Sequence, residues 1–175
     1  MFCIKKKELE KIRIIPDFPI KGVDFMDITT LLDDAETFQK TFQELLEQAR
    51  ELNPEVVVAL EARGYIFGPA LALALNVPFV PIRKKGKLPY KTFSADFALE
   101  YGTASIEIHQ ESIKENQRVL IFDDVLATGG TAEAAANLVK NFNPSSINFL
   151  FLIELSFLNG KEKLKDYSVN SMIIK

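Results

Sequence analysis

The chain has 175 residues, of which 47% are hydrophobic and 26% charged, and 21 Lys and Arg against 24 Asp and Glu give a formal net charge of −3. It is long enough for one domain with a real core, and its composition excludes collagen-like and disordered classes. The single cysteine, Cys3, excludes an intrachain disulfide, and the single histidine, His109, argues against a zinc enzyme. No apolar stretch is long enough to cross a membrane and the N-terminus does not resemble a secretory signal, so we expect a cytoplasmic protein without a membrane partner.

Positive charge is concentrated in residues 83–91, RKKGKLPYK, which we call the basic segment. It holds five basic side chains and no acidic one, which leaves 16 basic against 24 acidic residues in the rest of the chain. A small polyanion would be attracted to this segment. A nucleic acid spread over the surface is not expected, because such binding usually comes with a basic excess over the whole domain.

Three segments open the chain before its first predicted strand. The charged residues 5–12 predict a short helix, and the Pro-, Gly- and Asp-rich residues 14–25 predict an irregular segment. Residues 35–52 predict an amphipathic helix, because apolar residues recur there at spacings of three and four. Residues 56–60, VVVAL, then predict a strand that is buried on both faces.

Helices and strands alternate through the rest of the chain. In order, the sequence predicts a helix over 69–75, a strand over 79–82, two alternating segments over 93–99 and 104–109, a strand over 118–122, a helix over 131–142 and a strand over 147–152. Continuous apolar strands in this order indicate a parallel α/β sheet. The alternating pair indicates an antiparallel excursion or a mobile flap. Ligands of such sheets bind at the carboxyl ends of the strands.

The residues that follow the strand over 118–122 form the most informative motif. Residues 119–131 read VLIFDDVLATGGT, so two adjacent carboxylates precede a turn with two glycines and two threonines, and a helix follows. Backbone N–H groups of such a turn and of the helix N-terminus bind phosphate. A Walker-type loop is disfavoured because no lysine follows Gly130. The carboxylates can accept hydrogen bonds from vicinal hydroxyls, so the motif predicts a ribose 5-phosphate site.

This motif, DD-x-x-A-T-G-G-T, resembles the phosphoribosyl pyrophosphate (PRPP) signature of type I phosphoribosyltransferases. The resemblance implies that Asp123 and Asp124 hold the ribose hydroxyls. It also implies that residues 127–131, which we call the phosphate loop, bind the 5′-phosphate; they are Ala127, Thr128, Gly129, Gly130 and Thr131. The fold expected by resemblance is a twisted, mainly parallel sheet flanked by helices, with a small hood region and a mobile flap.

Four further stretches resemble adenine phosphoribosyltransferases in particular, and the resemblance runs from about residue 12 to residue 155. EARGYIFG at 61–68 resembles the pyrophosphate loop, RKKGKLP at 83–89 the basic loop, LEYG at 99–102 the catalytic flap, and PDFPIKGVDFMDITTLL at 16–32 the adenine-recognition segment. The roles implied are pyrophosphate binding by Arg63, Arg83 and Lys87, catalysis by Glu100 beside the flap residue Tyr101, and adenine binding by Asp24 and Phe25.

The resemblance also implies an activity, a cofactor and an assembly. The activity is transfer of 5-phosphoribosyl from PRPP to N9 of adenine, giving AMP and pyrophosphate, with Mg²⁺ carried by PRPP. A homodimer is expected. The chain is expected to form one domain over 1–175, with a hood at about 1–34 and a flap at about 83–109. Two alternatives stay open: a phosphoribosyltransferase for hypoxanthine, guanine or xanthine, and a non-catalytic PRPP-binding regulator.

The sequence departs from the family pattern at two positions. Met26 stands where the family usually has arginine, and Tyr90 stands where glycine or arginine is frequent. A methionine cannot supply the charged contact of an arginine. One polar contact to phosphate or ribose is therefore expected to be missing, with a lower affinity for PRPP.

Overall fold

A computed structural model describes residues 11–18, 21, 24–99 and 102–175. The chain forms two compact units, Met1–Leu45 and Leu46–Lys175. The helix expected over 5–12 lies almost entirely outside the described residues. In the part of the chain that the structure describes, no helix is long and apolar enough to cross a membrane.

The first unit contains a short antiparallel pair of strands, β1 (Arg13–Ile15) and β2 (Phe25–Asp27), in which Ile14 lies opposite Met26. Helix α2 (Thr29–Leu32) follows, and helix α3 (Ala35–Glu51) begins in this unit and continues into the second. The expectation of an irregular segment over 14–25 was therefore wrong at both ends, while the helix over 35–52 is confirmed.

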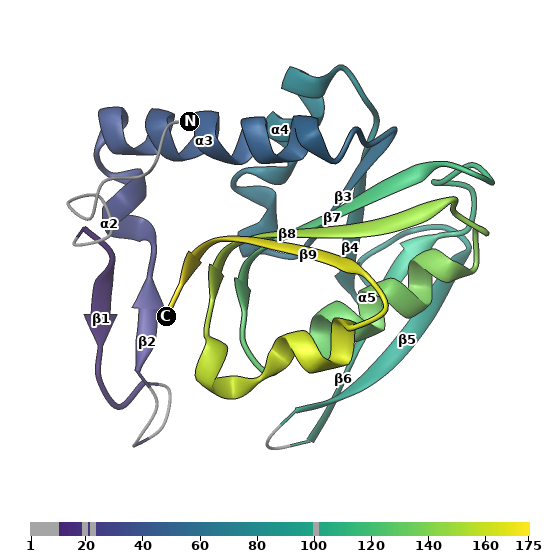
Figure 1. Cartoon of the computed structure of the whole chain (residues 1–175). Coiled ribbons are helices and arrows are strands. Elements are labelled where there is room, and N and C mark those ends of the chain that lie inside the picture. The colour runs from purple at the N-terminus through teal and green to yellow at the C-terminus, as the bar shows by residue number, and fades with distance from the viewer. Residues whose placement is uncertain (1–10, 19–20, 22–23, 100–101) are drawn as a thin grey trace. The chain divides into compact units, whose positions relative to one another are not determined.

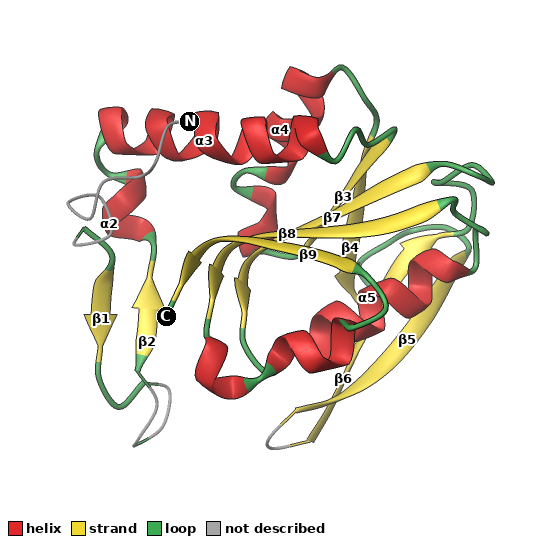
Figure 2. Ribbon diagram, viewed as in Figure 1, coloured by secondary structure: helices red, strands yellow, loops and turns green. Residues whose placement is uncertain are grey.

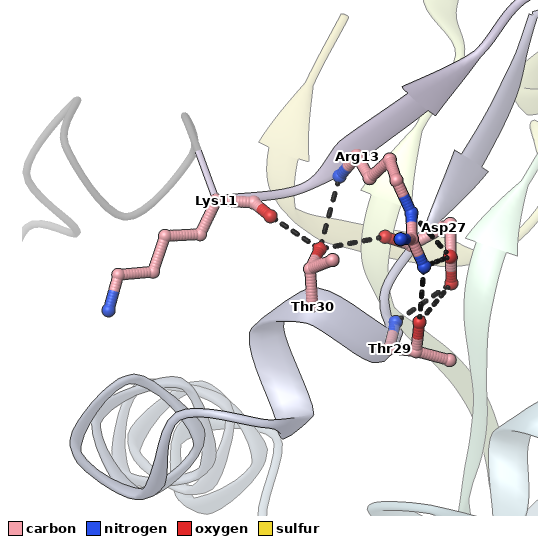
Figure 3. Close-up of polar contacts among 5 residues, drawn as sticks. All are labelled: Lys11, Arg13, Asp27, Thr29 and Thr30. Atoms are coloured by element: carbon pink, nitrogen blue, oxygen red, sulfur yellow. Dashed lines mark hydrogen bonds and ion pairs between the residues drawn. The ribbon is translucent and has the colours of Figure 1, made fainter.

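Polar contacts across the strand pair explain why it forms without a strong strand pattern (Figure 3). Arg13 Nε donates to Asp27 Oδ2 at 3.0 Å, and the Thr29 amide donates to Asp27 Oδ1 at 2.9 Å. The Arg13 amide donates to the Thr30 hydroxyl at 3.2 Å. The side-chain hydrogen bond from Arg13, followed by those from Thr29, lowers the pKa of Asp27 to about 2. These exposed hydrogen bonds fix the pairing of the strands, and the buried side chains of Met26, Ile28 and Leu31 supply the apolar packing of this unit.

The second unit is built on a seven-stranded sheet in the order β5-β6-β4-β3-β7-β8-β9 (Figure 1). Its elements are β3 (Val56–Leu60), η1 (Arg63–Tyr65), α4 (Gly68–Leu75), β4 (Phe79–Lys84), β5 (Thr92–Leu99), β6 (Gly102–His109), β7 (Arg118–Leu126), α5 (Gly130–Lys140), β8 (Ser146–Glu154), η2 (Ser156–Leu158), η3 (Gly160–Leu164) and β9 (Ser168–Ile174). The five strands β4, β3, β7, β8 and β9 are parallel, and β6 and β5 are antiparallel. This confirms the mainly parallel α/β sheet and the antiparallel excursion.

The connections create a switch point beside β3. From β3 the chain passes through α4 to β4 on one side, whereas β7 pairs with β3 on the other. Ligands of open α/β sheets bind in the crevice at such a point, outside the carboxyl ends of the strands. The residues after β3 and at the end of β7 are therefore brought to the same place.

Helices cover both faces of the sheet, with α4 on one side and α5 on the other (Figure 2). Val56, Val58 and Leu60 belong to the core cluster that includes the apolar side chains of α5. On the other face, the Phe67 and Phe122 rings lie 6.2 Å apart edge to face. All five residues of β3 are buried, as its unbroken apolar run predicts.

Two strands differ from the sequence prediction. β7 continues to Leu126 because Val125 and Leu126 still pair with β8, opposite Ile153 and Glu154. Asp123 and Asp124, which we call the acidic pair, were expected to follow the strand, but they lie within it. β9, which pairs with β8 in parallel, was not predicted. Its residues 168–174, SVNSMII, show no continuous apolar run until their end.

Candidate active site

The acidic pair lies in the part of β7 that extends beyond the end of β3. The register of these two strands ends at Phe122 opposite Ala59, whereas Asp123 still pairs with β8 opposite Phe151. Asp124 is 1% exposed, and its amide donates to Asp123 Oδ1 at 2.9 Å. The two carboxylates are thus held on a strand, which positions them more rigidly than a loop would.

Arg63, from the short helix η1 after β3, lies against the acidic pair. Its Nε is 3.0 Å from Asp124 Oδ2, and the arginine side chain is 43% exposed while the aspartate side chain is 1% exposed. Asp124 Oδ2 is buried and has no hydrogen bond of good geometry among the described residues. The contact is therefore chiefly electrostatic, and it ties the loop after β3 to the end of β7.

The environment favours the protonated form of both carboxyl groups more than water does. Burial raises the pKa of Asp123 well above its ordinary value, and the neighbouring charge of Asp124 raises it further. Burial also raises the pKa of Asp124, although Arg63 opposes this effect. Buried carboxylates with few internal partners gain from a ligand that donates hydrogen bonds, such as a sugar diol.

The phosphate loop leads directly from β7 into α5. Gly129 adopts φ +79°, a left-handed conformation that L side chains rarely adopt, and it is the N-terminal boundary residue of α5 without a side-chain cap. The first amides of a helix point outward and lack intrahelical acceptors, so they favour an anion. Thr128 and Thr131 flank the two glycines of this turn in the sequence.

These groups enclose a cavity of about 200 Å³. It is lined by Arg63, Asp123, Val125, Leu126, Ala127, Thr128, Gly129, Gly130, Thr131, Ala132 and Phe151. The structure thus brings one cationic side chain, one carboxylate and the whole phosphate loop to one cavity. Asp124 does not line this cavity, and its side chain, 1% exposed, is paired with Arg63.

The basic segment is held by two acidic side chains. The guanidinium of Arg83 donates to both carboxylate oxygens of Glu61, at 3.1 and 3.2 Å, and to the Lys87 carbonyl at 3.1 Å. Glu107, 5% exposed, accepts hydrogen bonds from the amides of Lys87 and Leu88 at 2.9 and 2.8 Å. Neither Arg83 nor Lys87 lines the cavity that contains Arg63.

Two of the residues expected to bind adenine or act on it lie in the first unit, and the other two lie outside the described residues. Asp24 is exposed, and Phe25 is partly buried with its ring 5.2 Å from that of Phe18, edge to face. Met26 is buried, at 7% exposure. Glu100 and Tyr101 lie outside the described residues. The roles of these residues remain predictions.

Sequence reasoning missed the glycines that make the site compact. A Cβ on Gly64 would lie 3.2 Å from Asp123 Oδ1 and 3.0 Å from the Phe122 carbonyl oxygen. This glycine therefore leaves the space in which the Asp123 carboxylate lies. The EARGYIFG motif contained the signal, because a glycine directly after Arg63 allows close approach of two backbones. Phe151, from β8, was also missed, because its place in the cavity depends on strand order.

Comparison with known proteins agrees with this geometry. Residues 29–174 match the phosphoribosyl transferase domain family. The adenine phosphoribosyltransferase of Alkaliphilus metalliredigens is 51% identical over 163 residues, which cover 93% of this chain and 96% of that protein. The adenine phosphoribosyltransferase of Thermosipho africanus is also 51% identical, with the same coverage.

Solved structures give the same result. The crystal structure of adenine phosphoribosyltransferase from Thermoanaerobacter pseudethanolicus superposes with a TM-score of 0.91 at 46% identity, covering 97% of this chain and 99% of that one. The enzyme from Saccharomyces cerevisiae, complexed with an imino-altritol bisphosphate and adenine, superposes with a TM-score of 0.88 at 39% identity, covering 95% and 97%. The chain therefore belongs to the phosphoribosyltransferase family, and within it to the adenine phosphoribosyltransferases.

Proposed function

We propose that this protein transfers the 5-phosphoribosyl group of PRPP to N9 of adenine, giving AMP and pyrophosphate. The C1′–N9 bond forms, the bond from C1′ to the pyrophosphate oxygen breaks, and the N9 proton leaves the base. The observation that carries the proposal is the cavity in which Arg63, Asp123 and the phosphate loop meet. Family membership favours adenine over the other purine bases and favours an enzyme over a PRPP-binding regulator.

The ribose 5-phosphate moiety fits the groups at the end of β7. Its phosphate would accept hydrogen bonds from the amides of the phosphate loop and the hydroxyls of Thr128 and Thr131. Its 2′- and 3′-hydroxyls would donate to the carboxylate of Asp123, which lines the cavity, and to that of Asp124, which a ribose would reach only if Arg63 moved aside. This arrangement would hold C1′ at the mouth of the cavity.

The leaving pyrophosphate needs cations, because negative charge grows on it as the C1′–oxygen bond lengthens. Arg63 is the first candidate, since it lines the cavity and its side chain is 43% exposed. A guanidinium can bind two phosphate oxygens at once. Arg83 and Lys87 remain candidates from the basic segment, although the guanidinium of Arg83 is hydrogen-bonded to Glu61.

Magnesium is proposed to arrive bound to PRPP, as part of the substrate. The described residues contain no group of three or more His, Cys, Asp and Glu side chains arranged to hold a metal ion. Asp123 and Asp124 are a pair of carboxylates next to the place proposed for the ribose, so they fit an ion shared with ribose hydroxyls better than a resident ion. The ion would supply positive charge to the pyrophosphate.

Adenine is proposed to bind through the segment containing Asp24 and Phe25, with the Phe25 ring stacked on the base. Glu100 is proposed to receive or share the purine proton as N9 attacks, while Tyr101 and the rest of the flap exclude water. These assignments are supported by the resemblance of the flap and of residues 16–32 to the family motifs.

A homodimer is proposed as the working form. The proposal is supported by the resemblance of the basic segment to the family's basic loop. Leu73 on α4, 83% exposed, and Tyr90 in the basic segment, 65% exposed, are apolar side chains that a partner subunit could cover. Sedimentation equilibrium would test the assembly, with a dimer expected and a monomer at micromolar concentration contradicting it.

The direct test of the activity is to mix the protein with Mg²⁺, PRPP and each purine base in turn and to measure nucleotide formation. AMP formation with adenine, and far less product with hypoxanthine, guanine or xanthine, is expected. Turnover with hypoxanthine but not adenine would overturn the proposed substrate, and a PRPP-dependent gel shift of DNA without turnover would support the regulator.

The site itself is tested by Asp123→Asn. This change keeps the size of the side chain but removes a carboxylate oxygen, so a ribose hydroxyl loses an acceptor, and we expect the KM for PRPP to rise by about tenfold or more. Asp166→Asn is the matched control, because Asp166 is exposed and does not line this cavity. Equal PRPP kinetics for the two variants would contradict the assignment.

A further inference from the structure

We propose that Gly160, the first residue of η3, is a positioning residue that sets where the phosphate loop lies. The inference rests on the proposed function of that loop and adds a residue from another part of the chain. Gly160 does not line the cavity, but it lies directly against residues 127–129, which do.

The contact is between two backbones that both lack side chains at this point. A Cβ built on Gly160 would lie 2.0 Å from the Ala127 carbonyl oxygen and 2.9 Å from the Gly129 nitrogen. In the other direction, a Cβ built on Gly129 would lie 2.4 Å from the Gly160 carbonyl oxygen. Each glycine thus occupies the space that a side chain on the other would need.

The segment that carries Gly160 is firmly anchored. Leu164, in the same short helix, is 0% exposed and belongs to the main core cluster. The chain reaches Gly160 through Asn159 in a left-handed conformation with φ 52°, and the Leu155 amide donates to the Leu126 carbonyl at 2.9 Å. Gly160 and Gly129 are both buried, while Thr128 in the loop and residues 161–163 in η3 are exposed. A collision between the two segments would therefore move them apart and change where the loop lies relative to the core.

The displacement expected from one added methyl group is large on the scale of a binding site. Ordinary contact of a Cβ with an oxygen begins at 3.4 Å, so the Ala127 carbonyl would have to move away from a Cβ at residue 160 by more than 1 Å. A misplacement of about 1 Å can cost about 100-fold in activity when it disturbs a bound group. The amides of Gly129 and Gly130 would no longer point at the same phosphate position.

The test is Gly160→Ala, studied in the full chain. We expect the KM for PRPP to rise by tenfold or more, and the affinities for AMP and ribose 5-phosphate, measured by calorimetry, to fall by a similar factor. The KM for adenine at saturating PRPP should change less than twofold. A loss that is equal for PRPP and adenine, or an unchanged KM for PRPP, would overturn the inference.

Leu164→Ala is the matched control for a general loss of stability. It removes a buried side chain from the same helix without adding an atom near the loop, so the unfolding temperature should fall while the KM for PRPP stays within twofold of the wild type. A tenfold rise in this variant would mean that any weakening of η3 disturbs the site, and the specific role of Gly160 would be rejected.

Two further variants separate the possible failures. If Gly160→Ala does not fold, Asn159→Ala is compared with Leu164→Ala, because alanine at 159 strains the left-handed turn that precedes Gly160. A KM for PRPP that rises in Asn159→Ala but not in Leu164→Ala supports the inference, and an equal KM in the two variants overturns it. If Asp123→Asn leaves PRPP binding intact, the proposed site is wrong. If Asp123→Asn weakens PRPP binding and Gly160→Ala does not, only the role of Gly160 is wrong.

Discussion

Glu107→Gln tests how the basic segment is held in place. Glu107 Oε1 accepts hydrogen bonds from the amides of Lys87 and Leu88, and Oε2 accepts one from the Thr92 hydroxyl at 3.4 Å. Burial alone would raise the pKa of Glu107, but the hydrogen bonds from Leu88, Gly86, Lys87 and Thr92 outweigh it and lower the pKa below its ordinary value. The charged form is therefore the stabilising one, and a neutral amide of the same shape should be worse.

The size of the effect follows from the number of bonds. A hydrogen bond to a charged acceptor contributes about 1.5–3 kcal/mol and one between neutral groups about 0.5–1.5 kcal/mol, so each amide bond loses about 1 kcal/mol. Two such bonds give about 2 kcal/mol, which for a chain of this length lowers the unfolding temperature by about 4–8 °C. Burying a neutral amide costs less free energy than burying a carboxylate, so the estimated loss of stability is an upper value.

The measurement is thermal and denaturant unfolding of Glu107→Gln beside Glu111→Gln, which removes the same charge from an exposed position. Because the folded state lowers the pKa of Glu107, its contribution is present above the ordinary glutamate pKa of about 4.3 and is lost as the pH falls through the lowered value. The difference in unfolding free energy between wild type and variant, which we call the gap, should therefore be largest at pH 7 and disappear below about pH 4. A gap under about 0.5 kcal/mol at pH 7, or one that widens in acid, would refute the reasoning.

Three other changes have definite expected outcomes. Glu100→Ala should lower kcat by roughly 10²- to 10⁴-fold with PRPP affinity nearly intact, as acid–base catalysis predicts, and unchanged turnover would remove Glu100 from the mechanism. Tyr65 donates its hydroxyl to the Ile82 carbonyl at 2.7 Å, and burial raises its pKa from 10.0 to about 12. A late step in the tyrosine titration at 295 nm is therefore expected, and it should vanish in Tyr65→Phe. The stability that Tyr65 contributes should be full below about pH 10 and lost by about pH 12. Gly68→Ala would place a Cβ 2.6 Å from the Ala59 Cβ, so it should destabilise the fold by about 1–3 kcal/mol, and the added change Ala59→Gly should recover part of that loss in unfolding experiments.

Local pattern was sufficient for most of the second unit. The unbroken run VVVAL predicted a strand buried on both faces, and all of β3 is buried. The helix over 35–52 and the alternating pair over 93–109 followed from periodicities of 3.6 and 2. The turn from β7 into α5 was predicted for the same reason, because two glycines after two carboxylates and before a helix all lie within one short stretch of sequence.

Features that depend on distant residues were not predictable in this way. The hydropathy pattern of β9 is weak, and the segment is a strand because its backbone pairs with the edge of β8. The β1–β2 pair depends on Arg13 meeting Asp27. The length of β7 was underestimated because its last residues pair with β8 alone, which places the acidic pair inside a strand.

The same distinction applies within the site. A motif reports which residues touch the ligand, because those residues are close together in sequence and carry recognisable chemistry. It says nothing of the residues that hold the motif in place, and here these are chemically plain: Gly64 leaves room for the Asp123 carboxylate, and Gly160 lies against the loop 31 residues after Gly129. A glycine outside any motif has no distinguishing property except the absence of a side chain, and only the fold shows that another backbone occupies that space. The close approach of Gly160 to Gly129 therefore links the position of the phosphate loop to η3 as well as to its own sequence.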